Sequence, residues 1–161
     1  MSRIHSVAVV GVVVAADGLV LATRRRDDGR WEPPGGILEA GERFEDGVRR
    51  EVHEETGLTV RVERLTGVYK NLLSDVVVLA YRCAPRAGTP GPQIETSAVE
   101  WITAEEAMRR MPPVFAARIT DALAGGPRRP GHTTATISSD PGSQGRHPCR
   151  CRANPPSESI T

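Results

Sequence analysis

The sequence predicts an α/β domain followed by a tail of different composition, on the basis of two observations. Valine-rich runs typical of β-strands lie on both sides of one strongly acidic helix, which we expect over residues 43–56. After residue 125 the composition changes to Gly, Pro, Ser, Thr and Arg with few apolar residues. The chain has 161 residues, so we predict one folded domain over residues 1–125 and a disordered tail over residues 126–161.

The first part of the domain predicts two strands and a loop. Residues 7–15 form a nearly unbroken apolar run, which is typical of a strand covered on both faces. An Asp-Gly pair at 17–18 separates this run from the apolar residues 19–23, and Asp-Gly between two such runs predicts a β-hairpin. Residues 27–36 are expected to form a loop, because the run ends in Pro-Pro-Gly-Gly.

The acidic helix is predicted to carry carboxylates at the border of its buried face. At about 100° per residue, Phe44, Val48 and Val52 share one stripe, and Glu51 and Glu55 lie beside it. These two glutamates are four residues apart and are therefore neighbours on the helix surface. Two carboxylates held close at the edge of a core either share a proton or bind a hard cation.

Shorter elements are expected after the helix, which should end at Gly57, a residue suited to the left-handed turn there. Thr103 is placed to cap a helix through a capping box with Glu106. The remaining predicted elements are strands at 60–69, 76–82 and 99–102, a Pro/Gly loop at 84–92, and a last helix at 114–123.

The acidic run has a fixed pattern of residues that resembles the Nudix box, the signature of the Nudix hydrolases. The family pattern sets nine positions, and this chain fills all of them: Gly36, Glu42, Arg50, Glu51, Val52, Glu54, Glu55, Gly57 and Leu58. The resemblance implies an α/β/α sandwich with a mixed β-sheet. It also implies Mg²⁺-dependent hydrolysis of a nucleoside diphosphate linked to another moiety, with Mn²⁺ as a possible substitute.

The resemblance also implies roles for the residues of the box. Glu51, Glu54 and Glu55 are expected to supply metal ligands or the catalytic base, with Arg50 orienting them. The three glutamates suit the role of metal ligands, because Mg²⁺ prefers carboxylate oxygens, water and phosphate oxygens. A solvated acidic helix face is the alternative.

Two glycines before the helix are further candidates for the metal site. Gly35 and Gly36 allow the backbone to approach closely, so a carbonyl there is an expected extra ligand. A bare turn is the alternative for this pair.

Other candidates lie outside the box. In small mutator-type members a loop glutamate at a position similar to Glu95 serves as ligand or base, although a solvated carboxylate is an equal alternative. Substrate contacts are expected from arginines that could hold a phosphate and from aromatic rings that could stack on a base. These substrate-binding candidates are Arg24, Arg25, Arg26, Trp31 and Tyr69.

The leading functional hypothesis is a mutator-type nucleoside triphosphate pyrophosphohydrolase. Resemblance to ADP-ribose pyrophosphatases would call for a proline shortly after the box, and residues 58–84 contain none. The alternatives are a hydrolase of ADP-ribose or a nucleotide sugar, a non-catalytic nucleotide-sensing Nudix domain, and an isopentenyl diphosphate isomerase.

The composition predicts the partners and the compartment. The net charge of +1 gives no electrostatic case for binding nucleic acid or a membrane. We expect a nucleotide substrate, a monomer or homodimer, and a cytoplasmic location, since no secretory signal pattern is visible at the start. Of the three cysteines, Cys83 is predicted to be a buried thiol. A metal site formed by His147, Cys149 and Cys151 is disfavoured because no fourth ligand accompanies them.

Overall fold

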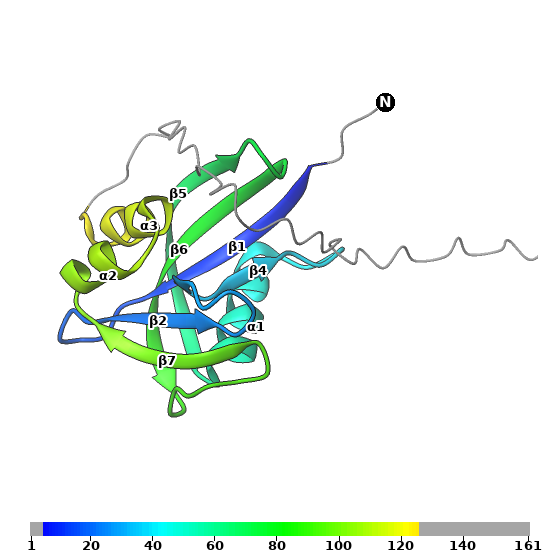
Figure 1. Ribbon diagram of the computed structural model, residues 1–161. Helices are drawn as coiled ribbons and strands as arrows, with labels where there is room; N and C mark the ends of the chain where they lie inside the picture. Colours follow the sequence, from blue (N-terminus) through cyan, green and yellow to red (C-terminus); the bar gives the residue numbers. More distant parts are fainter. Residues whose placement is uncertain (1–4, 126–161) are drawn as a thin grey trace, which may run out of the picture.

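The computed structural model of the protein describes residues 5–125, in which strands and helices form an α/β domain (Figure 1). The expectations for the tail, including His147, Cys149 and Cys151, lie outside the described residues. The strands are β1 Ser6–Val13, β2 Val20–Arg25, β3 Trp31–Glu32, β4 Gly35–Ile37, β5 Thr59–Asn71, β6 Val76–Ala87 and β7 Thr96–Ile102. The helices are α1 Phe44–Thr56, α2 Ala104–Arg110 and α3 Pro113–Leu123.

The strands form two sheets. The larger has the order β4-β1-β6-β5, in which β1 pairs parallel to β6 and antiparallel to β4, so the predicted mixed sheet is confirmed. The smaller is antiparallel, with the order β3-β2-β7. The parallel pair β1 and β6 requires a long crossover, and the chain supplies it through β2, β3, β4, α1 and β5.

Helices cover both faces of the larger sheet, as the sandwich expectation requires. Alternate residues of β1 point to opposite faces. Val9 and Val13 pack with Val48 and Val52 of α1, whereas Val12 belongs to the core on the side of α3. Figure 1 shows α2 and α3 together on one side of the sheet and α1 on the other. Among residues 5–125, none of the helices is long and apolar enough to cross a bilayer.

Helix α1 forms where the sequence indicates and ends as expected. Val48 and Val52 are fully buried, and acidic residues occupy its first turn, where the helix dipole favours negative charge. Gly57 has φ of 75°, and its N–H donates to the carbonyl of His53. Phe44 differs from the predicted stripe because it lies in the first turn and remains 45% exposed.

The predicted hairpin between the first two strands is wrong beyond its turn. Gly18 has φ of 88°, and its N–H donates to the Ala15 carbonyl, so the turn itself forms. Strands β1 and β2 then diverge into different sheets, and only the bridge between Val14 and Val20 joins them. Each strand finds longer partners elsewhere, namely β6 for β1 and β7 for β2.

The loop expected over residues 27–36 contains two short strands, β3 and β4, so that prediction is also wrong in part. Strand β4 pairs Gly35 with Val10 and Gly36 with Val9. A Cβ atom on Gly35 would lie 2.4 Å from the Val9 carbonyl oxygen. The glycines therefore do not prevent strand pairing here; they permit a backbone approach that a larger residue would block.

Later elements agree with the sequence apart from their lengths. Strand β6 runs into the expected Pro/Gly loop as far as Ala87, because β5 supplies a partner along its whole length. Thr103 caps α2 in a capping box with Glu106, which confirms that prediction. Cys83 is a buried free thiol, also as predicted, and burial raises its pKa to about 12.

Candidate active site

The structure brings the predicted carboxylates together beside the second half of α1. The buried stripe of α1 faces the sheet, which turns Glu51 and Glu55 toward the adjoining strand β4 and toward the segment that precedes β7. A pocket of about 250 Å³ opens there. Its lining residues are Glu51, Glu54, Glu55, Gln93, Ile94 and Glu95.

Arg50 joins three glutamates at one edge of this pocket. Its guanidinium holds both carboxylate oxygens of Glu42, with Nε–Oε1 of 2.8 Å and Nη2–Oε2 of 3.0 Å. Its Nη1 donates to Glu51 at 2.8 Å and to Glu54 at 3.2 Å, and Nη2 donates to the Ile37 carbonyl at 3.2 Å. A planar fork with five N–H donors suits this arrangement, so the geometry supports the orienting role expected for Arg50.

Glu55 is the most buried carboxylate of the pocket, with 7% of its surface exposed. The N–H of Gly35 donates to its Oε2 at 3.3 Å, and in residues 5–125 no basic side chain forms an ion pair with it. Burial raises its pKa to about 8, and the charges of Glu32, Glu51 and Glu95 add to that shift. Arg50 and Arg25 compensate Glu51 and Glu32, whereas Glu55 is left without a basic partner among residues 5–125.

Gly36 lies directly against Glu51. A Cβ atom at Gly36 would meet the Glu51 carboxylate at 2.5–2.6 Å, so this carboxylate occupies the space that a side chain would fill. Burial raises the pKa of Glu51, and the hydrogen bond from Arg50 opposes that shift. The backbone at Gly35 and Gly36, in strand β4, thus borders both Glu51 and Glu55, consistent with the expected close approach of this backbone to the metal site.

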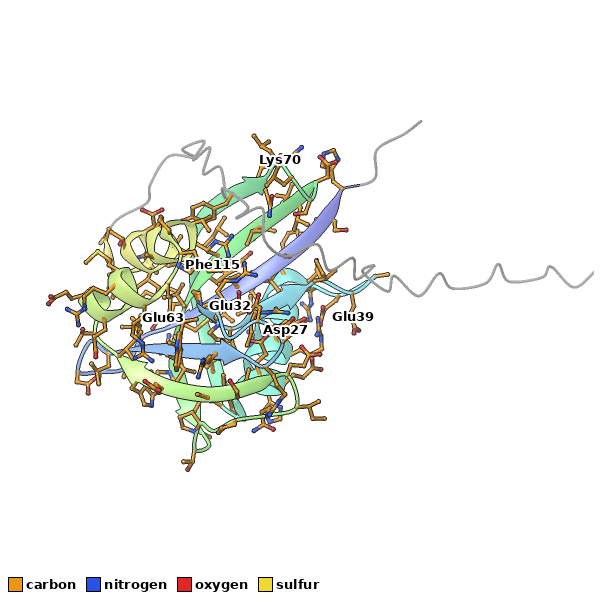
Figure 2. All side chains as sticks on the ribbon, in the orientation of Figure 1. Asp27, Glu32, Glu39, Glu63, Lys70 and Phe115 are labelled. Carbon is orange, nitrogen blue, oxygen red and sulfur yellow. The ribbon has the colours of Figure 1, made fainter. Side chains whose placement is uncertain are left out.

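Glu32 is a site residue that the sequence reasoning did not identify. Its carboxylate is 13% exposed, and Arg25 lies 3.4 Å away. Burial raises the pKa of Glu32, while Glu32 is the largest charge contribution to the raised pKa of Glu55. Figure 2 labels Glu32 and Asp27 near the end of β2. In the sequence, Glu32 is recognisable only as an acidic residue between Trp31 and the Pro-Pro-Gly-Gly run. Strand β3, which the sequence did not predict, is what places Glu32 near the site.

The three arginines at the end of β2 make contacts within the protein. Arg24 donates to the Gly29 carbonyl at 3.1 Å. Arg25 and Arg26 line a second pocket, of about 450 Å³, together with Asp27 and Glu95. Arg25 pairs with Asp27 and with the buried Glu32, so its charge is already compensated. Binding of substrate phosphate by these arginines stays a prediction, and the second pocket favours Arg25 and Arg26 over Arg24.

The two predicted stacking residues do not lie at the carboxylate pocket. Tyr69 is 5% exposed, its hydroxyl donates to Asp121 at 2.6 Å, and the Arg118 guanidinium lies 5.5 Å from its ring. Trp31 is half-buried, and Arg110 covers its ring at 4.0 Å. Both rings are thus occupied by arginines of α2 and α3, which counts against stacking of a base on either one.

The residues present fit a divalent cation of the Mg²⁺ type. Within the described part of the chain, no group of three or more His, Cys, Asp or Glu side chains is arranged so that it could hold a metal ion by itself. Mg²⁺ does not need one, because it keeps several waters and uses one or two carboxylates together with substrate phosphates. The buried Glu55 and the facing carboxylates Glu51, Glu54 and Glu95 supply oxygen ligands whose mutual repulsion a cation would relieve.

The raised pKa of Glu55 leads to a prediction for the metal-free protein. The folded-state pKa of Glu55 is about 8 and its ordinary value is 4.5, so folding favours the protonated form. The associated stability is fully present below pH 4.5 and is lost as the pH rises through about 8. In chelator, we expect Glu55→Gln to gain free energy of unfolding over the wild type as the pH increases across that window. Urea unfolding of both proteins measures the difference, and a pH-independent difference would contradict the assignment.

Comparison with known proteins agrees with this geometry. The family model described as NUDIX domain matches residues 4–123. A MutT-like protein of Streptomyces ambofaciens is 52% identical over 122 residues, which cover 76% of this chain and 79% of that protein. An ADP-ribose pyrophosphatase of Methanocaldococcus jannaschii is 37% identical over 71 residues, which cover 42% of each chain.

Solved structures share the fold at lower identity. A NUDIX hydrolase from Nitrosomonas europaea has a TM-score of 0.68 and 22% identity, covering 74% of this chain and 70% of that chain. A MutT protein from Methanosarcina mazei has a TM-score of 0.64 and 23% identity, covering 76% and 95%. Because the family model spans nearly all the described residues and the Streptomyces relative is similar over most of both chains, this chain belongs to the NUDIX family of hydrolases.

Proposed function

We propose that this pyrophosphohydrolase is a Mg²⁺-dependent enzyme that hydrolyses a nucleoside triphosphate to a nucleoside monophosphate and pyrophosphate. The observation that carries the proposal is the pocket beside α1. Four glutamates face it, and the most buried of them, Glu55, has no basic partner among residues 5–125. Such a set repels a polyphosphate until cations neutralise it, and it therefore suits a substrate that arrives with divalent metal.

The protein's own residues hold the reacting groups in this proposal. Glu51, Glu54 and Glu55 would hold the metal, with Glu95 opposite them and the backbone at Gly36 alongside. When bound, Mg²⁺ neutralises phosphate charge and lowers the pKa of a bound water. Arg50 fixes Glu51 through the 2.8 Å contact, so that carboxylate cannot swing away from the pocket.

A general base must take a proton from the attacking water. That water forms a new bond to phosphorus, and the bridging oxygen leaves with the other phosphoryl group. Two carboxylates remain candidates for the base. Glu51 is held by Arg50 and partly buried, whereas Glu95 is exposed and stands on a segment across the pocket.

The choice of nucleoside triphosphates is supported by the comparisons and by the sequence. A relative that matches 76% of this chain is named MutT-like, and the proline expected of ADP-ribose pyrophosphatases is missing from residues 58–84. Because an ADP-ribose pyrophosphatase also matches a shorter part of the chain, ADP-ribose is included among the substrates to be tested.

A product screen tests the proposal. Ordinary and oxidised nucleoside triphosphates, nucleotide sugars and ADP-ribose are incubated with the protein and Mg²⁺, and products are separated by ion-exchange chromatography. We expect a nucleoside triphosphate to give monophosphate and pyrophosphate, with turnover abolished by excess chelator. Turnover of only ADP-ribose or only a nucleotide sugar would contradict the proposed triphosphate substrate and identify that compound class as the substrate. Tight nucleotide binding without products would instead indicate a sensing domain.

A further inference from the structure

The segment that carries Glu95 is held by Arg26, the residue that directly follows β2. Four successive carbonyls, those of residues 93–96, accept hydrogen bonds from Arg26. The guanidinium donates to Gln93 at 3.2 Å, Ile94 at 3.0 Å and Thr96 at 2.9 Å. The backbone N–H of Arg26 donates to the Glu95 carbonyl at 3.0 Å. No other side chain in the described part of the chain donates to so many carbonyls of one segment.

The same segment is joined to the end of α1. The Thr96 hydroxyl donates to the Glu55 carbonyl at 2.9 Å and accepts from the Gln93 N–H at 2.8 Å. Nearby, the Gly91 N–H donates to the Thr56 carbonyl at 2.9 Å. Residues 93–96 thus bridge the end of β2 and the end of the helix that carries the glutamates.

We propose that Arg26 is a positioning residue that fixes Glu95 against the carboxylates of α1. This inference rests on the proposed function, in which Glu95 serves as a ligand or base. Three hydrogen bonds of the Arg26 guanidinium, from Nε and Nη2, are made to carbonyls of this segment, whereas phosphate binding by Arg26 stays a separate prediction. Glu95 itself is exposed, and neither an ion pair nor a side-chain hydrogen bond holds its carboxylate in residues 5–125. Its location therefore depends on the backbone that Arg26 holds.

The chemistry of the side chain makes the role specific to arginine. The donors at Nε and Nη2 point in fixed, different directions from one rigid plane, and they reach three carbonyls at once. A lysine offers a single ammonium on a flexible stem and can satisfy one of these carbonyls well. Arg26→Lys should therefore restore only part of what Arg26→Met loses.

Kinetics of a double-mutant cycle separate positioning from plain stability. Arg26→Met should lower kcat by about tenfold with little change in KM, since a displaced group acts mainly in the transition state. In the Glu95→Gln background, the same substitution should cause little further loss, because Arg26 acts through Glu95. Arg64→Met is the matched control. Arg64 also donates to two carbonyls, those of Ala122 and Ala124, but at the end of α3. It should lower stability without changing kcat.

Hydrogen exchange provides a second readout in the metal-free protein without substrate. The amides of residues 93–96 should exchange faster in Arg26→Met than in the wild type, and Arg64→Met should leave them unchanged. This result stands even if the wild type hydrolyses none of the tested nucleotides, in which case the proposed function alone fails. Unchanged exchange in Arg26→Met would overturn the proposal. Additive losses in the double variant, or wild-type turnover by Glu95→Gln, would overturn it as well.

Discussion

Replacing Glu55 by glutamine should lower kcat by about a hundredfold at saturating Mg²⁺ while leaving the fold intact. The substitution keeps the shape of the side chain and removes a ligand charge from the most buried position of the pocket. It also removes a carboxylate whose pKa is raised to about 8 by burial and by the neighbouring carboxylates, so the metal-free variant should melt at a higher temperature than the wild type near that pH. Activity and stability are thus expected to change in opposite directions.

The measurement combines steady-state kinetics with thermal melts in chelator. Glu105→Gln is the matched control, because Glu105 also forms part of a helix, pairs with Arg109 on the surface and lies outside the pocket. It should leave kcat unchanged. Near wild-type kcat in Glu55→Gln would show that Glu55 is not a metal ligand of the active site.

The second large effect is expected from Arg50→Lys. Lysine cannot hold both oxygens of Glu42 and at the same time contact Glu51 and Glu54, as the Arg50 guanidinium does. Three carboxylates would lose a defined orientation. We expect the free energy of unfolding to fall by roughly 1–3 kcal/mol, in line with the loss of charged hydrogen bonds from a partly buried group. We also expect kcat/KM to fall by at least about tenfold.

Arg49→Lys provides the comparison for Arg50, since it changes the preceding residue of the same helix. Arg49 forms one exposed ion pair, with Asp46 at 2.8 Å, and such pairs contribute about 0.3–0.5 kcal/mol. Urea unfolding and nucleotide hydrolysis are measured for both variants. Equal behaviour of the two would indicate that Arg50 is an ordinary surface residue.

The sequence predicted the elements whose residues determine them locally. The stripe of Val48 and Val52 and the left-handed Gly57 located α1 to within a residue at each end. The positions of Glu51 and Glu55 beside that stripe were predicted for the same reason, because helical periodicity alone turns them toward the core border. Thr103 and Glu106 likewise form their capping box from neighbouring residues.

The features that the sequence did not predict depend on residues far apart in the chain. Pairing of β4 with β1 places the two glycines of the Pro-Pro-Gly-Gly run in a strand, and pairing of β3 with β2 brings Glu32 close enough to Glu55 to raise its pKa. Tyr69 is buried against α3, where its hydroxyl donates to Asp121 and Arg118 lies over its ring. The residues near position 69 in the sequence do not predict these contacts. The contacts of Arg26 with residues 93–96 span about seventy positions, so no local pattern could predict them.

Binding of a divalent cation in the absence of nucleotide tests the central claim most directly. Mn²⁺ is titrated into the metal-free protein, and free Mn²⁺ is followed by electron paramagnetic resonance for the wild type, Glu55→Gln and Glu105→Gln. We predict that the wild type and Glu105→Gln bind Mn²⁺ equally, whereas Glu55→Gln binds it at least about tenfold more weakly. Equal binding by all three proteins would contradict the assignment of the α1 carboxylates as the metal site.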